Sequence, residues 1–170
     1  MPNLDQQRIL ALDIRPRSFA FVVFEGPEEL LDWGARSFRQ GVNAVLVPLG
    51  PKVAKLLDEY LPELVLLEQP GTRTLEQIVE IQKQAEIHKV PVRLLSPRVV
   101  HEAFAGRDDN KHQIASVIAE RFSELLSILP PKRKPWQSED YRMTIFDAAA
   151  RGIAYFTSGA ANDRVLSGPT

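Results

Sequence analysis

Short apolar runs separated by polar breaks fill the first forty residues. The runs over 8–14 and 19–25 are rich in β-branched and aromatic residues and have the length of strands. They are joined by RPRS, a connection of hairpin length, and the run over 30–37 follows as a candidate third strand. This pattern predicts an antiparallel meander of three strands.

Helical spacing then alternates with further apolar runs. We expect strands over 64–67 and 92–95, and helices over 51–60, 72–88, 97–104, 111–126 and 142–156. The apolar stripe predicted for the second helix comprises Leu75, Ile78, Val79, Ile81, Ala85 and Ile87. The run over 42–49 fits either a short strand or the start of a helix. The segment 130–140 has three prolines and no periodicity, which is typical of a loop. This order of elements predicts an α/β fold, with a mixed sheet and helices on its faces.

Length and composition narrow the class of protein. A chain of 170 residues predicts one domain, with ends over 1–7 and 158–170 that we expect to be flexible. The polar start, and the lack of any apolar run near the roughly 20 residues of a membrane span, favour a cytoplasmic protein with no membrane partner. Without cysteine the chain has no disulfide and no thiolate metal site. Its net charge of −1 means that a nucleic-acid partner would need a local basic patch.

Three acidic residues stand in unusually apolar surroundings. Asp13 and Glu68 each lie at the carboxyl end of an apolar strand, and Asp147 interrupts the apolar helix MTIFDAAARGIAYF. If the two strands are parallel neighbours, their ends lie about 5 Å apart and the carboxylates repel each other. A divalent cation with oxygen ligands would relieve this repulsion, and Mg²⁺ or Mn²⁺ fits best.

These acids and the motifs around them resemble a known family. The blocks RILALDIRPRSFAFVVFE, LVLLEQP, NKHQIA and FDAAARGIA are similar, in order and spacing, to those of RuvC-type Holliday junction resolvases. The similarity spans about residues 9–154. It implies a ribonuclease H-like fold: a mixed five-stranded sheet, an antiparallel meander followed by parallel strands, with helices on both faces.

The resemblance also implies a function and a set of site residues. The function is a metal-dependent, structure-selective endodeoxyribonuclease of DNA recombination and repair that acts on branched DNA as a homodimer. Asp13, Glu68 and Asp147 match the acids that bind two Mg²⁺ or Mn²⁺ ions, and Lys111 matches a basic residue near the scissile phosphate. The residues expected to contact nucleic acid are Arg15, Arg17, Lys132, Arg133 and Lys134.

The chain departs from the family pattern at several positions. Thr144 replaces a second acid or histidine of the last helix, although Glu139 or Asp140 of the preceding loop are candidates for its role. His101 stands where the family has a basic residue, and RPRS replaces a glycine-rich turn. The segment 71–90 is shorter than the corresponding dimerisation segment. Thr144 and His101 favour an alternative, a catalytically weak or inactive RuvC-like domain that binds nucleic acid or a protein.

Simpler interpretations exist for the same residues. A strand-end acid is commonly a turn residue, and Asp147 has the i+4 spacing for a buried ion pair with Arg151. Lys111 and the basic loop run KRKPW are also compatible with solvated surface. An actin-like ATP-binding protein is a third class, but it requires a glycine-rich phosphate turn and about twice the chain length.

Overall fold

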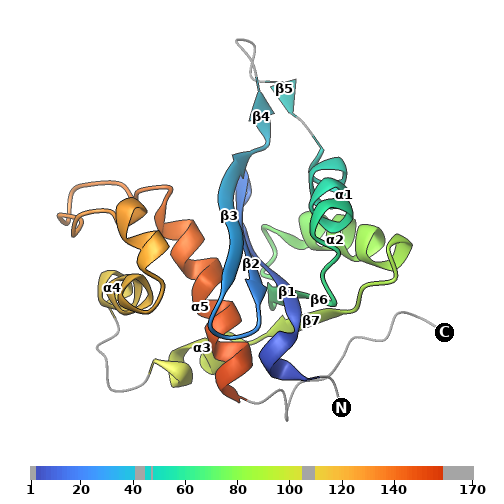
Figure 1. Cartoon of the computed structure of the whole chain (residues 1–170). Coiled ribbons are helices and arrows are strands. Elements are labelled where there is room, and N and C mark those ends of the chain that lie inside the picture. Colours follow the sequence, from blue (N-terminus) through green and yellow to red (C-terminus); the bar gives the residue numbers. More distant parts are fainter. Residues whose placement is uncertain (1–2, 41–44, 47, 105–109, 159–170) are drawn as a thin grey trace.

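The computed structural model describes residues 3–40, 45–46, 48–104 and 110–158, and contains a five-stranded sheet in the order β3-β2-β1-β6-β7 (Figure 1). Its strands are β1 (Arg8–Ile14), β2 (Ser18–Glu25), β3 (Leu30–Ser37), β6 (Leu64–Glu68) and β7 (Val92–Leu95). The first three form the antiparallel meander, and β6 and β7 run parallel to β1. Two short strands, β4 (Arg39–Gln40) and β5 (Val45–Leu46), pair separately and project from the body of the molecule.

Helices cover both faces of the sheet, as the sequence predicts. On one face lie α1 (Leu49–Tyr60) and α2 (Leu75–Ile87), which pack against each other. On the other lie α4 (Lys111–Arg121), the 3₁₀ segment η2 (Ser123–Ile128) and α5 (Met143–Ser158). The short helix α3 (Pro97–Ala103) follows β7 and packs against α5.

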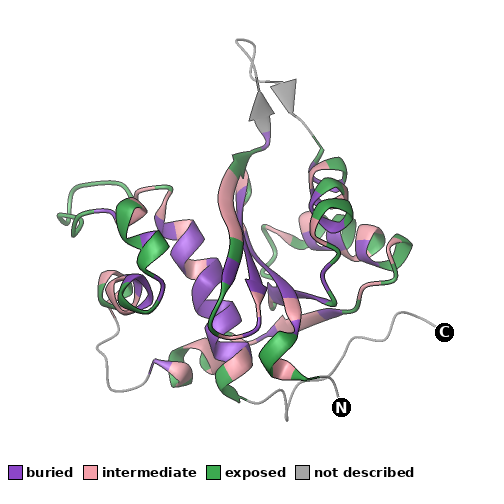
Figure 2. Cartoon of the chain, in the orientation of Figure 1, coloured by how far each residue is buried: buried purple, intermediate pink, exposed green. Residues whose placement is uncertain are grey.

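The central strand β1 is buried on both faces (Figure 2). Ile9 and Ala11 face the core under α4 and α5, whereas Leu10 and Leu12 face the core under α1 and α2. A strand covered on both sides reads as a continuous apolar run, which is the pattern of this strand and of β6. An acid that ends such a strand is therefore held at the margin of the core.

Helix α5 lies very close to the sheet where small residues interrupt its otherwise bulky buried surface. Ala148 and Ala149 are fully buried. A Cβ atom on Gly152 would lie 2.1 Å from Cε2 of Phe24 on β2, so only glycine allows this approach. The close packing brings the polar residues of α5, Asp147 and Arg151, against the end of β1.

Several element boundaries differ from the sequence prediction. Helix α2 begins at Leu75 rather than at residue 72, and the Thr74 amide closes a turn on the Gly71 carbonyl before it. Of the predicted stripe, Ile78, Ile81 and Ala85 are buried, whereas Leu75, Val79 and Ile87 are exposed. Helix α4 ends at Arg121 because Phe122 adopts an extended backbone, and the chain continues as η2.

The two ends of the chain and the run over 42–49 are only partly described. Residues 1–2, 159–170, 41–44 and 47 lie outside the described residues, and α1 begins within the run, at Leu49. Leu4–Gln6 forms a 3₁₀ turn capped by Asn3, and the buried Gln7 side chain accepts a hydrogen bond from the Tyr155 hydroxyl. None of the helices in the described ranges is long and apolar enough to cross a membrane.

Candidate functional site: a carboxylate site filled by basic side chains

The site forms where β1 and β6 end side by side. Ala11 pairs with Leu66 in the parallel ladder, so Asp13 and Glu68, each two residues further on, reach the same edge of the sheet. Asp13 is 3% exposed, whereas Glu68 is half-buried. A carboxylate as buried as Asp13 needs a cation or several hydrogen-bond donors.

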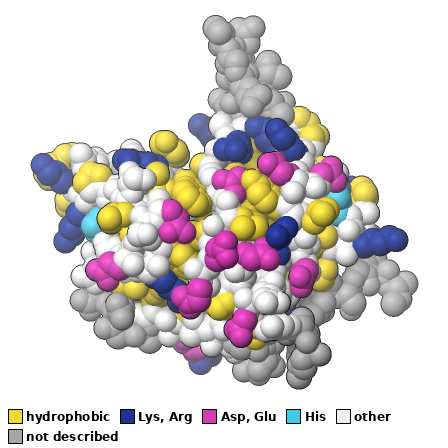
Figure 3. Space-filling model, in the orientation of Figure 1, with side chains coloured by type: hydrophobic (Ala, Val, Ile, Leu, Met, Phe, Trp, Pro, Cys, Tyr) yellow, Lys and Arg dark blue, Asp and Glu magenta, His cyan; other side chains and the backbone are white. Residues whose placement is uncertain are grey.

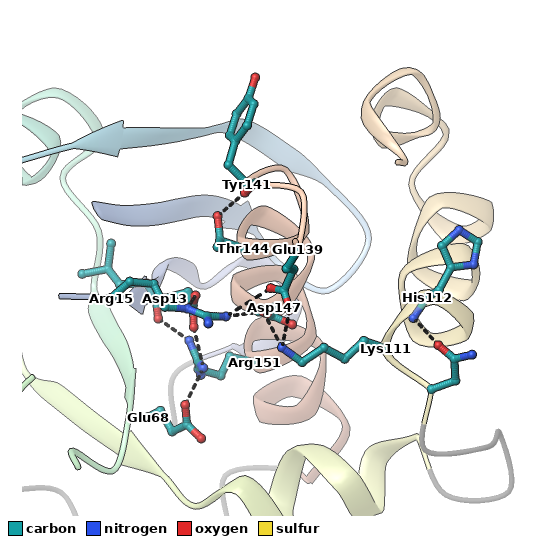
Figure 4. Close-up of polar contacts among 12 residues, drawn as sticks. Asp13, Arg15, Glu68, Lys111, His112, Glu139, Tyr141, Thr144, Asp147 and Arg151 are labelled. Carbon is teal, nitrogen blue, oxygen red and sulfur yellow. Dashed lines mark hydrogen bonds and ion pairs between the residues drawn. The ribbon is translucent and has the colours of Figure 1, made fainter. Parts of the chain in front are cut away.

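Arg151 of α5 supplies one cation to this pair of acids (Figure 4). Its Nη2 lies 2.9 Å from Oδ1 of Asp13 and 2.8 Å from Oε2 of Glu68. Its Nη1 donates to the carbonyl oxygen of Leu12 at 2.6 Å. Arg151 is 6% exposed, so the guanidinium is enclosed between the two strand ends.

A second guanidinium joins Asp13 to the acid of α5. Arg15 Nε donates to Oδ2 of Asp13 at 2.8 Å, and its Nη2 donates to Oδ2 of Asp147 at 2.7 Å. Lys111, at the start of α4, places Nζ 3.5 Å from Asp147 and 3.3 Å from Glu139, which also lies 3.7 Å from Arg15. Four carboxylates and three basic groups therefore form one continuous network.

The surroundings of Asp147 change its proton affinity. Burial raises the pKa of the Asp147 carboxyl, and the negative charge of Asp13 raises this pKa further. Lys111 and Arg15 act in the opposite direction and lower it. Without the two basic side chains that contact it, the pKa of the Asp147 carboxyl would be higher still.

The predicted ion pair between Asp147 and Arg151 does not form. Arg151 turns to Asp13 and Glu68, and Asp147 is contacted by Arg15 and Lys111 instead. The physical reason is that Asp13 is the most deeply buried acid of the group and lies within reach of the same guanidinium.

The two loop acids proposed to replace the acid missing at Thr144 behave differently. Glu139 enters the network through Arg15 and Lys111. Asp140 pairs with Arg142, whose guanidinium and backbone amide lower the pKa of Asp140 to about 2. Thr144 donates its hydroxyl hydrogen bond to the Tyr141 carbonyl.

The donor set can be tested against the predicted Mg²⁺ or Mn²⁺ ions. Asp13, Glu68 and Asp147 converge, but both oxygens of Asp13 and one oxygen of each partner already accept hydrogen bonds from arginine. Within the described ranges, no group of three or more acidic or histidine side chains is arranged to hold a metal ion. As folded here, these residues do not fit a divalent ion.

A cleft of about 700 Å³ opens beside the network. Its walls include Arg73, a residue that the sequence analysis did not single out, and His101 of α3. An adjoining open hollow of about 510 Å³ is lined by Arg15, Arg17 and Arg73. Arg17 and Arg73 are exposed, and no carboxylate in the described part of the chain pairs with either. The sequence feature that could have identified Arg73 is its position in a loop, five residues after the strand-end acid Glu68.

The loop over 130–140 forms a second basic region. A hollow of about 500 Å³ between this loop and the start of α4 is lined by residues that include Lys111, Lys132 and Arg133. Lys134 Nζ lies 5.5 Å from the centre of the Trp136 ring, and that ring is largely exposed. The face seen in Figure 3 carries charges of both signs, so basic character is local.

The fold resembles those of several Holliday junction resolvases. RuvC of T. thermophilus, in complex with a Holliday junction substrate, matches with a TM-score of 0.69 at 15% identity, over 94% of this chain and 99% of that one. The fowlpox virus resolvase, solved with Holliday junction DNA, matches with a TM-score of 0.57 at 19% identity, over 88% and 99%. The yeast mitochondrial Holliday junction resolvase gives 0.51 at 13% identity, over 91% and 81%.

These likenesses confirm the fold that the motifs predict. No protein-family model matches the sequence, and no curated protein matches it significantly. The chain has the ribonuclease H-like fold of RuvC and other junction resolvases, at 15–19% sequence identity to them.

Proposed function

We propose that this protein is a RuvC-fold domain that binds branched DNA. The observation that carries the proposal is the hollow lined by Arg15, Arg17 and Arg73, which opens next to the cleft at the end of the sheet. Two of these arginines have no acidic partner in the described ranges and are available to phosphates. The likeness in fold to proteins solved with Holliday junction DNA supports the choice of partner.

The loop over 130–140 supplies a second set of contacts. Lys132, Arg133 and Lys134 are exposed and suited to neutralise phosphates, and Trp136 offers an exposed ring on which an unpaired base can stack. Phosphate contacts position a protein without reading sequence. Preference for a branched molecule would then come from the simultaneous use of both basic regions.

The test is fluorescence anisotropy with a four-way junction and a linear duplex of equal length, in EDTA. Tighter binding of the junction is expected. The double variant Arg17→Ala with Arg73→Ala should bind it at least tenfold more weakly, because two phosphate contacts are lost. Lys55→Ala with Lys83→Ala, exposed positions on α1 and α2, is the matched control of equal charge change. Equal loss in both double variants would remove the arginine hollow from the interface.

A metal-dependent endonuclease of branched DNA is the second candidate. It is favoured by the convergence of Asp13, Glu68 and Asp147 at one edge of the sheet. If Arg15 and Arg151 moved aside, these acids would hold two Mg²⁺ or Mn²⁺ ions, which activate water and stabilise the leaving oxygen in such enzymes. Lys111 would then lie near the phosphate.

Cleavage separates the two candidates. Junction DNA that is bound but stays intact in Mg²⁺ or Mn²⁺ supports the binding domain. Cleavage that requires the metal and disappears in Asp13→Asn supports the nuclease.

Light scattering at several protein concentrations tests the predicted homodimer, which would give a four-way junction two equivalent binding surfaces. The predicted role in DNA recombination and repair depends on the cleavage result, whereas the predicted cytoplasmic location stays a prediction.

A further inference from the structure

We propose that the guanidinium groups of Arg151 and Arg15 are built-in cations that take the place of divalent metal ions between the carboxylates. The site lies at the edge of the proposed DNA-binding cleft. We infer that the wild-type protein needs no metal ion at this site and binds none. What this means for DNA binding rests on the proposed function.

The position of Arg151 is the first argument. A cation shared by Asp13 and Glu68 must lie between the ends of β1 and β6, and Nη2 of Arg151 lies there, at 2.9 and 2.8 Å from the two carboxylate oxygens. The same side chain is held by the Leu12 carbonyl through Nη1. A metal ion could enter this space only if the guanidinium left it.

Arg15 occupies the corresponding position on the other side of Asp13. Its Nε and Nη2 link Asp13 to Asp147 at 2.8 and 2.7 Å. Each oxygen of Asp13 therefore accepts from a different arginine. Two ions sharing one central carboxylate would need the same two oxygens.

Charge balance gives an independent argument. Four carboxylates, those of Asp13, Glu68, Asp147 and Glu139, face three basic side chains, Arg15, Arg151 and Lys111. The basic side chains therefore offset most of the electrostatic attraction that such an acidic cluster would have for a dication. The guanidinium groups and a metal ion would compete for the same carboxylate oxygens. A lysine can lose its proton and give way to the metal ion, but an arginine stays charged.

Packing keeps the guanidinium of Arg151 in position. Its side chain is 7% exposed, and the next residue, Gly152, lies against the Phe24 ring. Withdrawal of Arg151 would expose the buried Asp13 and break three hydrogen bonds. The consequence is that binding of DNA beside this site proceeds without metal and without hydrolysis.

The experiment measures Mn²⁺ binding and thermal stability, not activity. Electron paramagnetic resonance of free Mn²⁺ should show no uptake by the wild type, whose Tm should be equal in EDTA and in excess Mn²⁺. Arg151→Ala should have a lower Tm in EDTA, take up Mn²⁺, and regain stability as the ion binds to the folded state. Arg142→Ala, which removes an arginine paired to Asp140 outside the network, should take up none.

Two results would overturn the inference. One is stoichiometric Mn²⁺ binding by the wild type, and the other is a folded Arg151→Ala protein that takes up no Mn²⁺. If Arg151→Ala does not fold, Arg151→Gln, which retains a donor for the Leu12 carbonyl, replaces it, and the wild-type measurement stands alone in any case. Junction binding in EDTA is scored separately. Mn²⁺ uptake with intact junction binding defeats only this inference, whereas loss of junction preference defeats only the proposed function.

Discussion

Asp13 is the residue on which the character of the site depends. In a cluster of mutually repelling acids, neutralising one acid relieves repulsion and raises stability. In the arrangement found here, Asp13 instead compensates two guanidinium groups, one of them almost fully buried. The two situations predict changes of opposite sign for the same substitution.

We expect Asp13→Asn to lower the free energy of unfolding by about 3 kcal/mol, because it removes one of the two carboxylates that pair with the buried Arg151 and turns an amide donor toward an arginine donor. Urea denaturation in EDTA measures the change. Glu102→Gln, in an exposed pair with Arg98, is the control and should shift stability by less than about 1 kcal/mol. A more stable Asp13→Asn protein would show that repulsion between the acids dominates the site.

Gly152 tests the packing that brings Arg151 to the sheet. A Cβ atom there would meet the Phe24 ring at 2.1 Å, so Gly152→Ala should cost about 2 kcal/mol through displacement of α5. Gly71→Ala, where an added Cβ meets nothing within 4 Å, should stay within about 0.5 kcal/mol of the wild type. Equal unfolding midpoints for the two variants would mean that the Phe24 ring gives way easily.

The ion-pair partners of single residues were the hardest feature of the site to predict from the sequence. The helical i+4 spacing suggests an ion pair between Asp147 and Arg151, and this is wrong: Arg151 pairs with Asp13 and Glu68. That choice depends on how close α5 lies to the end of β1, which Gly152 and the neighbouring alanines decide. The convergence of Asp13 and Glu68 was predictable, since both end apolar strands. The cations were not: Arg151 reaches these two acids from α5, and Arg15, which follows β1, links Asp13 to Asp147.

At the scale of elements, α1 and α2 are joined at their carboxyl-terminal ends. His88, which follows α2, places Nε2 2.9 Å from Asp58 of α1, and its Nδ1 lies 2.8 Å from the Gln84 carbonyl. The Gln84 carbonyl raises the pKa of His88 and Asp58 raises it further, whereas burial lowers it. A protonated His88 therefore stabilises the pairing of these two helices.

The sign of the pH effect follows from this raised pKa. The stabilising contribution is complete below the unfolded pKa of about 6.5 and is lost as the pH rises through the higher pKa of the folded protein. We expect the stability difference between the wild type and His88→Gln to shrink from about pH 6 toward pH 9, measured by urea denaturation across that range. In the Asp58→Asn background, the stability difference caused by His88→Gln should also shrink as the pH rises, but by a smaller amount. The reason is that the Gln84 carbonyl remains as a partner of His88. A difference that is constant with pH would mean that the pKa of His88 is the same in the folded and unfolded protein.

Elements differ in how far the sequence specifies them. The meander strand Leu30–Ser37 and the strand Val92–Leu95 have the predicted bounds. Helix ends are less well specified: α4 stops at Arg121 although apolar spacing continues, since Phe122 turns into the core with an extended backbone. The exposed Leu75, Val79 and Ile87 show that an apolar stripe can be wider than the surface that covers it.

At the scale of the whole molecule, a net charge of −1 means that DNA is attracted only by particular regions of the surface. The salt dependence of binding counts the phosphates that such regions neutralise, at a slope of about 0.9 per contact in a plot of log affinity against log salt. The triple variant Lys132→Ala, Arg133→Ala and Lys134→Ala should therefore lower the slope for junction binding by about 2 to 3.

Trp136 provides the contrast within the same loop. Trp136→Ala should weaken junction binding roughly tenfold while leaving the salt slope unchanged, because stacking on a base releases no counterions. Anisotropy titrations at several salt concentrations give both quantities from one experiment, and Lys55→Ala with Lys83→Ala controls for the loss of positive charge elsewhere on the surface. A triple variant with the wild-type slope would place the loop away from DNA. The arginine hollow would then have to account for binding alone, and its two unpaired arginines can neutralise at most a few phosphates. The salt slope of the wild type therefore decides how many basic regions the DNA touches at once.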